Sequence, residues 1–216
     1  MENDHIPELK YLDFLKSEDA VTYFGQLDYL LKDGVHFQDY GNQISYYRFL
    51  KKYKDSLNLY YERFFGISLK EENEQSDSYF FLDFNTSSRG NIPQAFRENL
   101  KNEYIIIGLI MYKILFLEGN VELVSIQKLK ETIRNDYQEF KPGLRKLIAQ
   151  STVEKDNFDD DEAIDNAIDR ALKQFRKLAW LDYKKDTFES RASFHRIISI
   201  YEDVIMRIDE IIESYA

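Results

Sequence analysis

The chain has 216 residues, of which 44% are hydrophobic and 15% aromatic. This length and composition exclude a disordered tail and provide enough apolar surface for one large or two small domains. The formal net charge of -10 disfavours tight, nonspecific DNA binding by the chain alone, because that affinity comes from neutralising phosphates. The absence of cysteine excludes a disulfide framework and a thiolate zinc site, and a reducing intracellular compartment is the simplest setting.

The sequence predicts neither a secretory signal nor a membrane span. The N-terminal stretch MENDHIPELKYLDF lacks a positively charged start and a continuous apolar core, so we expect no signal peptide and a cytoplasmic location. The most apolar run, residues 104–117, contains Lys113 and is shorter than the ~20 residues that a membrane span needs. We therefore predict a helix buried in protein and no membrane partner.

The first half of the chain predicts a helix, a short strand, more helix and then a hairpin. Ser17 caps the first helix, which Gly34 ends. Its apolar positions recur at helical spacing: Val21, Phe24, Leu27, Leu30 and Leu31. VHF at 35–37 is a short strand, Asn42 caps the helical segment 43–65, and a weak break falls at Asp55 and Ser56. Two strand-like runs then flank a polar turn within residues 67–84.

That order of elements is typical of a winged helix, in which a hairpin covers the open edge of a small helical core. The stretch NTSSRGNIP at 85–93 has the composition of a linker, and Pro93 suits the first turn of a new helix. We predict an N-terminal winged-helix domain over residues 1–88. The C-terminal domain is predicted over 89–216, with a long apolar helix at about 93–118.

The second half repeats the plan. Ser125 caps a helix to about Asn135, and Pro142 and Gly143 interrupt the helical pattern. One amphipathic helix follows, with an apolar face made by Ile164, Ile168, Leu172, Phe175 and Leu178. It leads into a second hairpin within 180–196, with AWLDYKK and RASFHRI as strands, and Ser199 with Glu202 forms a capping box before a last helix. The predicted fold class is mainly α with small β-hairpins, arranged as tandem winged-helix domains.

Signals of enzymatic chemistry are weak. The histidines, His5, His36 and His195, are far apart and show no metal-ligand spacing. The chain has no phosphate-binding glycine motif and no nucleophile-elbow motif. The acidic run at 154–165 lacks the glycine of a calcium-binding loop, and its carboxylates suit the N-terminus of the next helix instead. We predict no catalytic, cofactor-binding or metal-binding residue.

Two basic clusters are candidates for phosphate contact, each with a solvated helix face as the alternative. For Arg48, Lys51, Lys52 and Lys54 the solvated face is favoured, because the adjacent wing KEENEQSD is acidic. For the second cluster both interpretations stay open, since the acidic start of its helix is unsuited to a groove. The DNA-contact candidates are Arg170, Lys173, Arg176, Lys177, Lys184, Lys185 and Arg191.

Aromatic residues are unusually dense in SYYRFLKKYKDSLNLYYERFFG, which contains more rings than one helix face can bury. Tyrosine is enriched at protein interfaces, so an interface and an aromatic-rich core are both open interpretations. The protein-interface candidates are Tyr46, Tyr47, Phe49, Tyr60 and Tyr61.

Specific strings in the chain resemble the MukE family, including its MksE-type relatives. They include LDYLLKDGVHFQDYGN, FLKKYKDSLNLYYERFFGISL, SYFFLDF, GNIPQAFRENL, FLEG, ALKQFRKLAWLDY and FESRASFHRI. The likeness covers about residues 20–200 and depends on the order of elements and on these strings together. The chain ends without a long acidic C-terminal extension, which favours a shorter MksE-like or plasmid-defence (Wadjet-type) relative.

The resemblance implies a non-enzymatic, tandem winged-helix subunit of a bacterial condensin-like SMC complex. It implies a homodimer that binds a kleisin and meets the SMC-type ATPase indirectly, at the nucleoid, in chromosome organisation and segregation or in plasmid defence. DNA would be bound weakly or only within the complex, and no catalytic residue is carried over. The alternative hypothesis is a stand-alone winged-helix DNA-binding transcription regulator, which would carry a basic recognition helix and a compatible wing.

Overall fold

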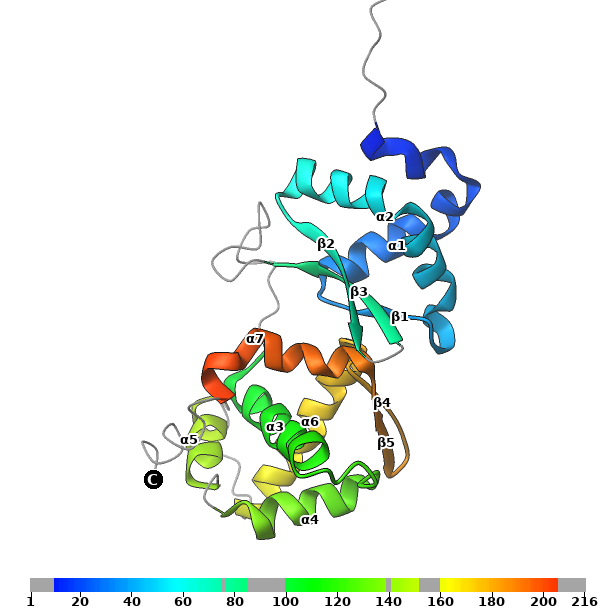
Figure 1. Ribbon diagram of the computed structural model, residues 1–216. Helices are drawn as coiled ribbons and strands as arrows, with labels where there is room; N and C mark the ends of the chain where they lie inside the picture. Colours follow the sequence, from blue (N-terminus) through cyan, green and yellow to red (C-terminus); the bar gives the residue numbers. More distant parts are fainter. Residues whose placement is uncertain (1–9, 75–76, 85–99, 139–140, 152–159, 206–216) are drawn as a thin grey trace, which may run out of the picture. The chain divides into compact units, whose positions relative to one another are not determined.

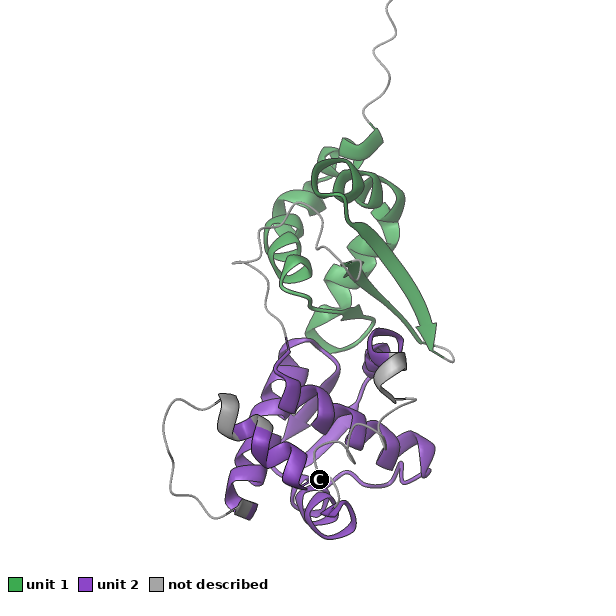
Figure 2. Ribbon diagram, turned by 90° about the vertical axis from the view of Figure 1, so that its left-hand side faces the viewer, with its two compact units in different colours: residues 1–98 green, residues 99–216 purple. Residues whose placement is uncertain are grey.

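The computed structural model describes residues 10–74, 77–84, 100–138, 141–151 and 160–205. The chain divides into two compact units, Met1–Glu98 and Asn99–Ala216 (Figure 2). The predicted boundary between residues 88 and 89 falls outside the described residues. Each unit has its own secondary structure and core and is described by itself.

The N-terminal unit has the element order of a winged helix (Figure 1). A 3-10 segment, Lys10–Lys16, precedes α1 (Glu18–Lys32), β1 (Phe37–Gln38) and α2 (Ile44–Phe65). The hairpin follows as β2 (Ser68–Glu74) and β3 (Asp77–Asp83). The antiparallel sheet has the order β1-β3-β2, with Phe37 opposite Phe80 and Leu69 opposite Leu82, so the short strand closes the inner edge of the hairpin.

Local capping signals explain where these helices begin and end. The Ser17 hydroxyl accepts a hydrogen bond from the Asp19 amide at 3.1 Å, as predicted. Gly34 and Gly66 follow α1 and α2 with φ of 85° and 66°, a region that glycine enters without steric cost. The Asn42 cap was wrong: Asn42 lies in a 3-10 turn, Gly41–Gln43, and α2 begins after Gln43 without a side-chain cap.

The break in α2 lies at Tyr53, whose φ of -114° and ψ of 21° are not helical, rather than at Asp55 and Ser56. The kink divides α2 into the two helices that a helix-turn-helix requires. Both halves bury one stripe, which includes Leu50 before the kink and Leu57 after it. Val21, predicted on the apolar face of α1, is 90% exposed, because α1 buries Ala20, Leu27 and Leu31 instead.

The C-terminal unit is built around α3 (Asn102–Tyr112), which continues as a π-helical turn, Lys113–Leu117. It is followed by α4 (Ile126–Asp136), α5 (Lys141–Ser151) and α6 (Asp160–Lys177). The hairpin β4 (Leu181–Lys184) and β5 (Thr187–Ser190) and then α7 (Arg196–Ile205) complete the unit. An isolated antiparallel bridge joins Ser125 to Thr187, so the chain before α4 pairs with β5 as β1 pairs with β3.

The apolar run is a buried helix, as predicted, but it begins later than residue 93. Lys101 is extended, with φ -65° and ψ 147°, and α3 starts at Asn102; residues 93–99 lie outside the described part of the chain. Ile107, Ile110 and Ile114 are fully buried in the core of this unit. Gly108 lies where α3 passes α6 and α7, since an added Cβ would meet Ile197 Cδ1 at 2.5 Å and Phe175 Cζ at 2.9 Å.

The second hairpin is shorter than predicted. Its return strand is TFES at Thr187–Ser190, whereas RASFHRI forms a 3-10 turn at Ala192–His195 and the start of α7. Trp180, Phe188 and Phe194 are buried in the core there, and such rings suit a helix as well as a strand. The capping box at Ser199 was wrong because α7 already begins at Arg196; the chain beyond Ile205 lies outside the described residues.

Both units therefore share one plan: a helix, an extended segment, further helices, and a hairpin whose second strand pairs with that segment. The fold is mainly α with small antiparallel hairpins, as predicted, and its element order is consistent with tandem winged helices.

Candidate functional site

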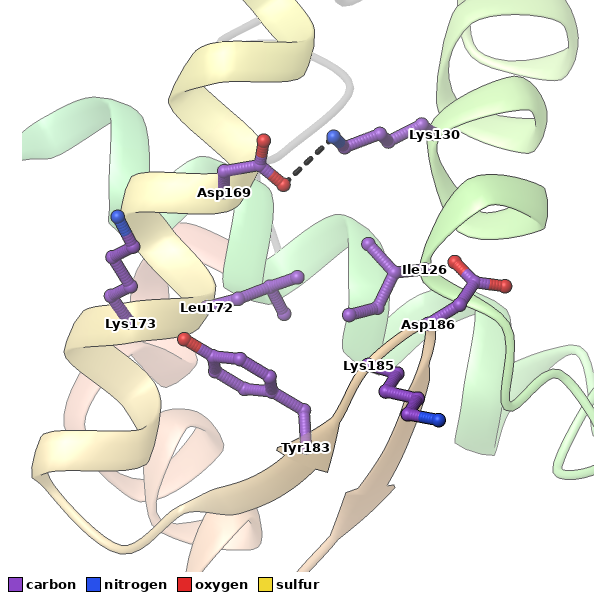
Figure 3. A pocket seen from close by; sticks show the side chains of 8 residues that line it. All are labelled: Ile126, Lys130, Asp169, Leu172, Lys173, Tyr183, Lys185 and Asp186. Atoms are coloured by element: carbon purple, nitrogen blue, oxygen red, sulfur yellow. Dashed lines mark ion pairs between the residues drawn. The ribbon is translucent and has the colours of Figure 1, made fainter.

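A pocket of about 350 Å³ opens between α4, α6 and the hairpin β4–β5 of the C-terminal unit (Figure 3). Its apolar floor is formed by one residue from each element: Ile126, Leu172 and Tyr183. Leu172 is buried with the α6 stripe that the sequence predicted, while Ile126 and Tyr183 are half-buried. Five charged residues surround this floor and make the pocket chemically mixed: Lys130, Asp169, Lys173, Lys185 and Asp186.

An ion pair crosses one end of the pocket. Lys130 Nζ of α4 lies 2.7 Å from Asp169 Oδ1 of α6, and the Lys130 side chain is only 14% exposed. Arg134 of α4 binds Asp165 of α6 at 3.3 Å, and Lys141 of α5 binds Asp161 of α6 at 3.0 Å. These pairs align α4 and α5 with α6, so the pocket walls are held by charge as well as by packing.

The hairpin turn is tied to the N-terminus of α4 by Asp186. Its carboxylate accepts hydrogen bonds from the Ser125 hydroxyl at 2.7 Å and from the Gln127 amide at 2.9 Å, and its carbonyl accepts the Ile126 amide at 2.7 Å. Ser125 Oγ also accepts from the Lys128 amide, as the predicted cap. Hydrogen bonds from the Ser125 hydroxyl and the Gln127 amide lower the pKa of Asp186.

The seven predicted DNA-contact residues divide into three groups. Arg176 binds Asp182 at 3.0 Å and lies over the Tyr183 ring, while Arg191 binds Glu189 at 3.0 Å with its side chain 11% exposed. Lys177 is exposed at the last residue of α6. Within the described part of the chain, no ion pair joins the four remaining exposed cations to a carboxylate: Arg170, Lys173, Lys184 and Lys185. Only Lys173 and Lys185 of these four line the pocket.

Three of the four residues in the first basic cluster are paired with carboxylates, whereas Arg48 is exposed and has no ion pair within the described residues. Glu71 of the wing accepts Lys51 at 2.6 Å and Lys54 at 2.8 Å, and Lys52 lies 3.3 Å from Asp19. Burial raises the pKa of Glu71, but the hydrogen bonds from both lysines outweigh that effect and lower it. Glu71 of the acidic wing therefore packs on the basic face of α2. From the sequence alone, only the opposite charges of the two segments could be recognised.

The five interface candidates do not share one surface. Phe49 is 3% exposed and Tyr61 is fully buried, which corrects their assignment, because neither offers a side chain to a partner. Tyr46 donates to Gln26 at 2.6 Å and packs on Tyr23. Tyr47 and Ser78 share a hydrogen bond, and Tyr60 is half-buried against Phe14 and Phe24.

Two apolar residues of the same helix were missed. Leu59 is 43% exposed and Phe64 47% exposed, both after the Tyr53 kink. A signal for Leu59 existed: it is two residues from Leu57 and therefore ~200° around the helix from the buried stripe.

His36 and His195 belong to different units. His36 is buried and stacks on Phe81 in the N-terminal unit, while His195 Nδ1 lies 3.0 Å from the Tyr112 hydroxyl in the C-terminal unit; His5 lies outside the described residues. Among the residues that the structure describes, no group of three or more His, Asp or Glu could hold a metal ion. No helix in the described part of the chain is long and apolar enough to cross a membrane.

Comparison with known families matches residues 22–201 to the profile described as condensin complex protein MksE. The matched range begins in α1 and ends in α7, so it includes both hairpins and the pocket. The chain belongs to the MksE family. A comparison with proteins of curated function finds no match. MksE membership makes the chain a subunit of a condensin-like complex and agrees with the resemblance drawn from its sequence.

Proposed function

We propose that this MksE-family chain is a non-enzymatic subunit that dimerises and binds the kleisin of an SMC-type complex. The observation that carries the proposal is the family match across residues 22–201, which spans both units. In this scheme ATP hydrolysis belongs to the SMC partner, which the chain meets through the kleisin. The complex works on DNA in the cytoplasm, at the nucleoid, in chromosome organisation and segregation or in plasmid defence.

The N-terminal unit supports a protein partner over DNA. In a DNA-reading winged helix, the helix before the wing and the wing itself present free cations to phosphates. Here Lys51 and Lys54 are engaged by Glu71 of the wing. The Asn58 carbonyl oxygen accepts the Leu69 amide at 2.8 Å, and its amide donates to Glu62, so the polar residues of this helix serve the fold.

The same helix also exposes apolar surface. Leu59 and Phe64 are each more than two fifths exposed, within one turn of Glu62 and Arg63. Apolar side chains with charges around them are typical of a protein interface core with its polar rim. We propose that this half of α2 contributes to contact with the kleisin.

Direct DNA contact in this proposal is weak and indifferent to sequence. Of the seven DNA-contact candidates, four have no ion pair within the described residues, and they belong to a chain with a net charge of -10: Arg170, Lys173, Lys184 and Lys185. Stronger binding would then require kleisin and ATPase to add their own basic surfaces. The stand-alone transcription regulator is the alternative that the same experiment addresses.

The test is affinity purification of the tagged full chain from its native cell, followed by mass spectrometry of the bound proteins. We expect a kleisin and a long coiled-coil ATPase in the eluate. The variant Leu59→Asp should recover less kleisin, whereas Val21→Asp, an equal change at a side chain that is 90% exposed on α1, should recover as much as wild type. Recovery of one enriched promoter fragment with neither protein would favour the regulator instead.

A further inference from the structure

The pocket is lined by three lysines and two aspartates, which gives it a net charge of +1. Of its two carboxylates, Asp169 is engaged by Lys130, and Asp186 is engaged by the Ser125 hydroxyl and the Gln127 amide. Lys173 and Lys185 lie on either side of the apolar floor (Figure 3), exposed and without an ion pair to any residue that the structure describes. The pocket as folded is therefore complementary to an anion with an apolar part.

The geometry disfavours a phosphate as that anion. A helix N-terminus is the usual phosphate site because its amides are free, but at α4 the Gln127 amide already binds the Asp186 carboxylate. Ile126, Leu172 and Tyr183 offer apolar contact, which a DNA backbone does not use but a peptide side chain does.

The backbone at Lys185 is a second observation. Lys185 is the first residue of the two-residue turn between β4 and β5 and has φ of 55°. Glycine or asparagine is favoured at such a position because a side chain costs roughly 1–2 kcal/mol in the left-handed region. A lysine kept there at a cost in stability indicates a use for its charge.

We propose that the pocket binds an acidic segment of a partner protein. One apolar side chain of that segment enters between Ile126, Leu172 and Tyr183, and carboxylates on either side of it bind Lys173 and Lys185. The inference rests on the proposed function in one respect, that the segment belongs to another subunit of the condensin-like complex.

The chain offers a closely matched pair of variants. Lys173→Glu with Lys185→Glu reverses two charges in the pocket, one on α6 and one on the hairpin. Arg170→Glu with Lys184→Glu makes the same change in charge on the same two elements, at exposed residues that do not line the pocket. Circular dichroism of both variants checks that they fold.

The probe is a displayed library of short random peptides selected on the full-length wild-type protein. The most enriched sequence is then synthesised with a fluorescent label and titrated by anisotropy. We expect enriched peptides with acidic residues around one apolar residue. The pocket variant should weaken binding by about tenfold or more, because charge-assisted hydrogen bonds are lost, and the matched variant should weaken it less than about threefold.

Three results would overturn the inference: no enriched peptide, enriched peptides without acidic residues, or equal weakening by both variants. Tight binding of a labelled DNA duplex that only the pocket variant abolishes would also overturn it and assign the pocket to nucleic acid. Two outcomes distinguish a failure of this inference from a failure of the proposed function. If the pocket variant still recovers the kleisin from cells, the proposed function stands without this site; if wild type recovers none, the proposed function fails even where the peptide binds.

Discussion

At the scale of single residues, a few carboxylates decide how the charged side chains of this chain are used. Glu71 neutralises two lysines of α2, and Asp186 holds the second hairpin to α4. Both carboxylates have a lowered pKa because they accept hydrogen bonds in the folded state. Each carboxylate thereby occupies groups that a DNA-binding winged helix would leave free to contact phosphates.

Glu71→Gln should destabilise the protein by about 1 kcal/mol at neutral pH, because two partly exposed ion pairs are lost. Since the folded pKa of Glu71 lies below its ordinary value of about 4.3, its contribution is present above that pH and lost as pH falls through the folded pKa. Urea denaturation of wild type and variant, followed by circular dichroism at neutral pH and at a pH below the folded pKa of Glu71, measures the difference in the free energy of unfolding. Asp39→Asn, at an exposed residue, is the control. A difference that persists at low pH would contradict the expectation.

Lys185→Gly should separate stability from binding. Glycine relieves the left-handed backbone at φ 55°, so the free energy of unfolding should be unchanged or raised by up to about 1 kcal/mol. Peptide binding in the pocket should nevertheless weaken, because the charge is gone. Trp180 fluorescence during urea denaturation reports the C-terminal unit that contains this turn. A clear loss of stability would show that the lysine side chain itself supports the turn.

At the scale of elements, helix packing in the C-terminal unit depends on close approach to α3. Gly108 permits that approach, because Phe175 of α6 and Ile197 of α7 occupy the space of a side chain. Within the sequence YIIIGLIMY, Gly108 has the lowest helix propensity, and no local signal requires a glycine there. The reason for glycine is therefore found in the neighbouring helices.

Gly108→Ala should destabilise the protein by about 1–2 kcal/mol, since the clash with two fully buried side chains outweighs the better helix propensity of alanine. Gly25→Ala in α1 is the matched control, because an added Cβ there meets no atom within 4 Å. It should stabilise by roughly 0.5–1 kcal/mol. Thermal denaturation of both variants measures the two signs. A stabilised Gly108→Ala would mean that Phe175 and Ile197 can move aside.

At the scale of the whole molecule, charge separates a protein-binding subunit from a DNA-reading one. The net charge of -10 opposes the approach of a phosphate backbone. Affinity for DNA alone should therefore be small, while protein contacts through apolar and mixed surfaces remain available.

DNA binding should be weak and salt-sensitive. Four phosphate contacts would lower the affinity about 50-fold between about 50 and about 150 mM salt. We expect no detectable binding of a labelled duplex at the higher salt by fluorescence anisotropy. At the lower salt both double variants, K173E/K185E and R170E/K184E, should weaken it equally, because nonspecific binding depends on total charge. Submicromolar affinity for one sequence at the higher salt would support the regulator.

The protein is expected to be a homodimer in solution. The chain mass is 25.8 kDa, so sedimentation at micromolar concentration should give a species of about twice that mass. The physical reason is the apolar surface exposed on helices, which association would remove from water. A single species at the mass of one chain would count against dimerisation.

Much of the fold follows from short-range patterns. Ser17 and Ser125 cap the predicted helices, Gly66 ends α2, and β-branched and aromatic residues around a polar turn produce a hairpin within 67–84. Such signals depend on residues within one or two turns of each other, so the chain alone determines them. The order of these elements and the strings they contain were also enough to indicate the MksE family.

Only the tertiary structure determines which side chains are paired, buried or left exposed on each surface. The sequence alone did not show that Glu71 would reach Lys51 and Lys54, that Asp186 would occupy the start of α4, or that Phe49 and Tyr61 would be buried. Those outcomes depend on segments distant in sequence approaching within a few ångströms. Packing stabilises one of the several arrangements that local patterns allow. The pocket of Lys173 and Lys185 can therefore be recognised only in the folded chain.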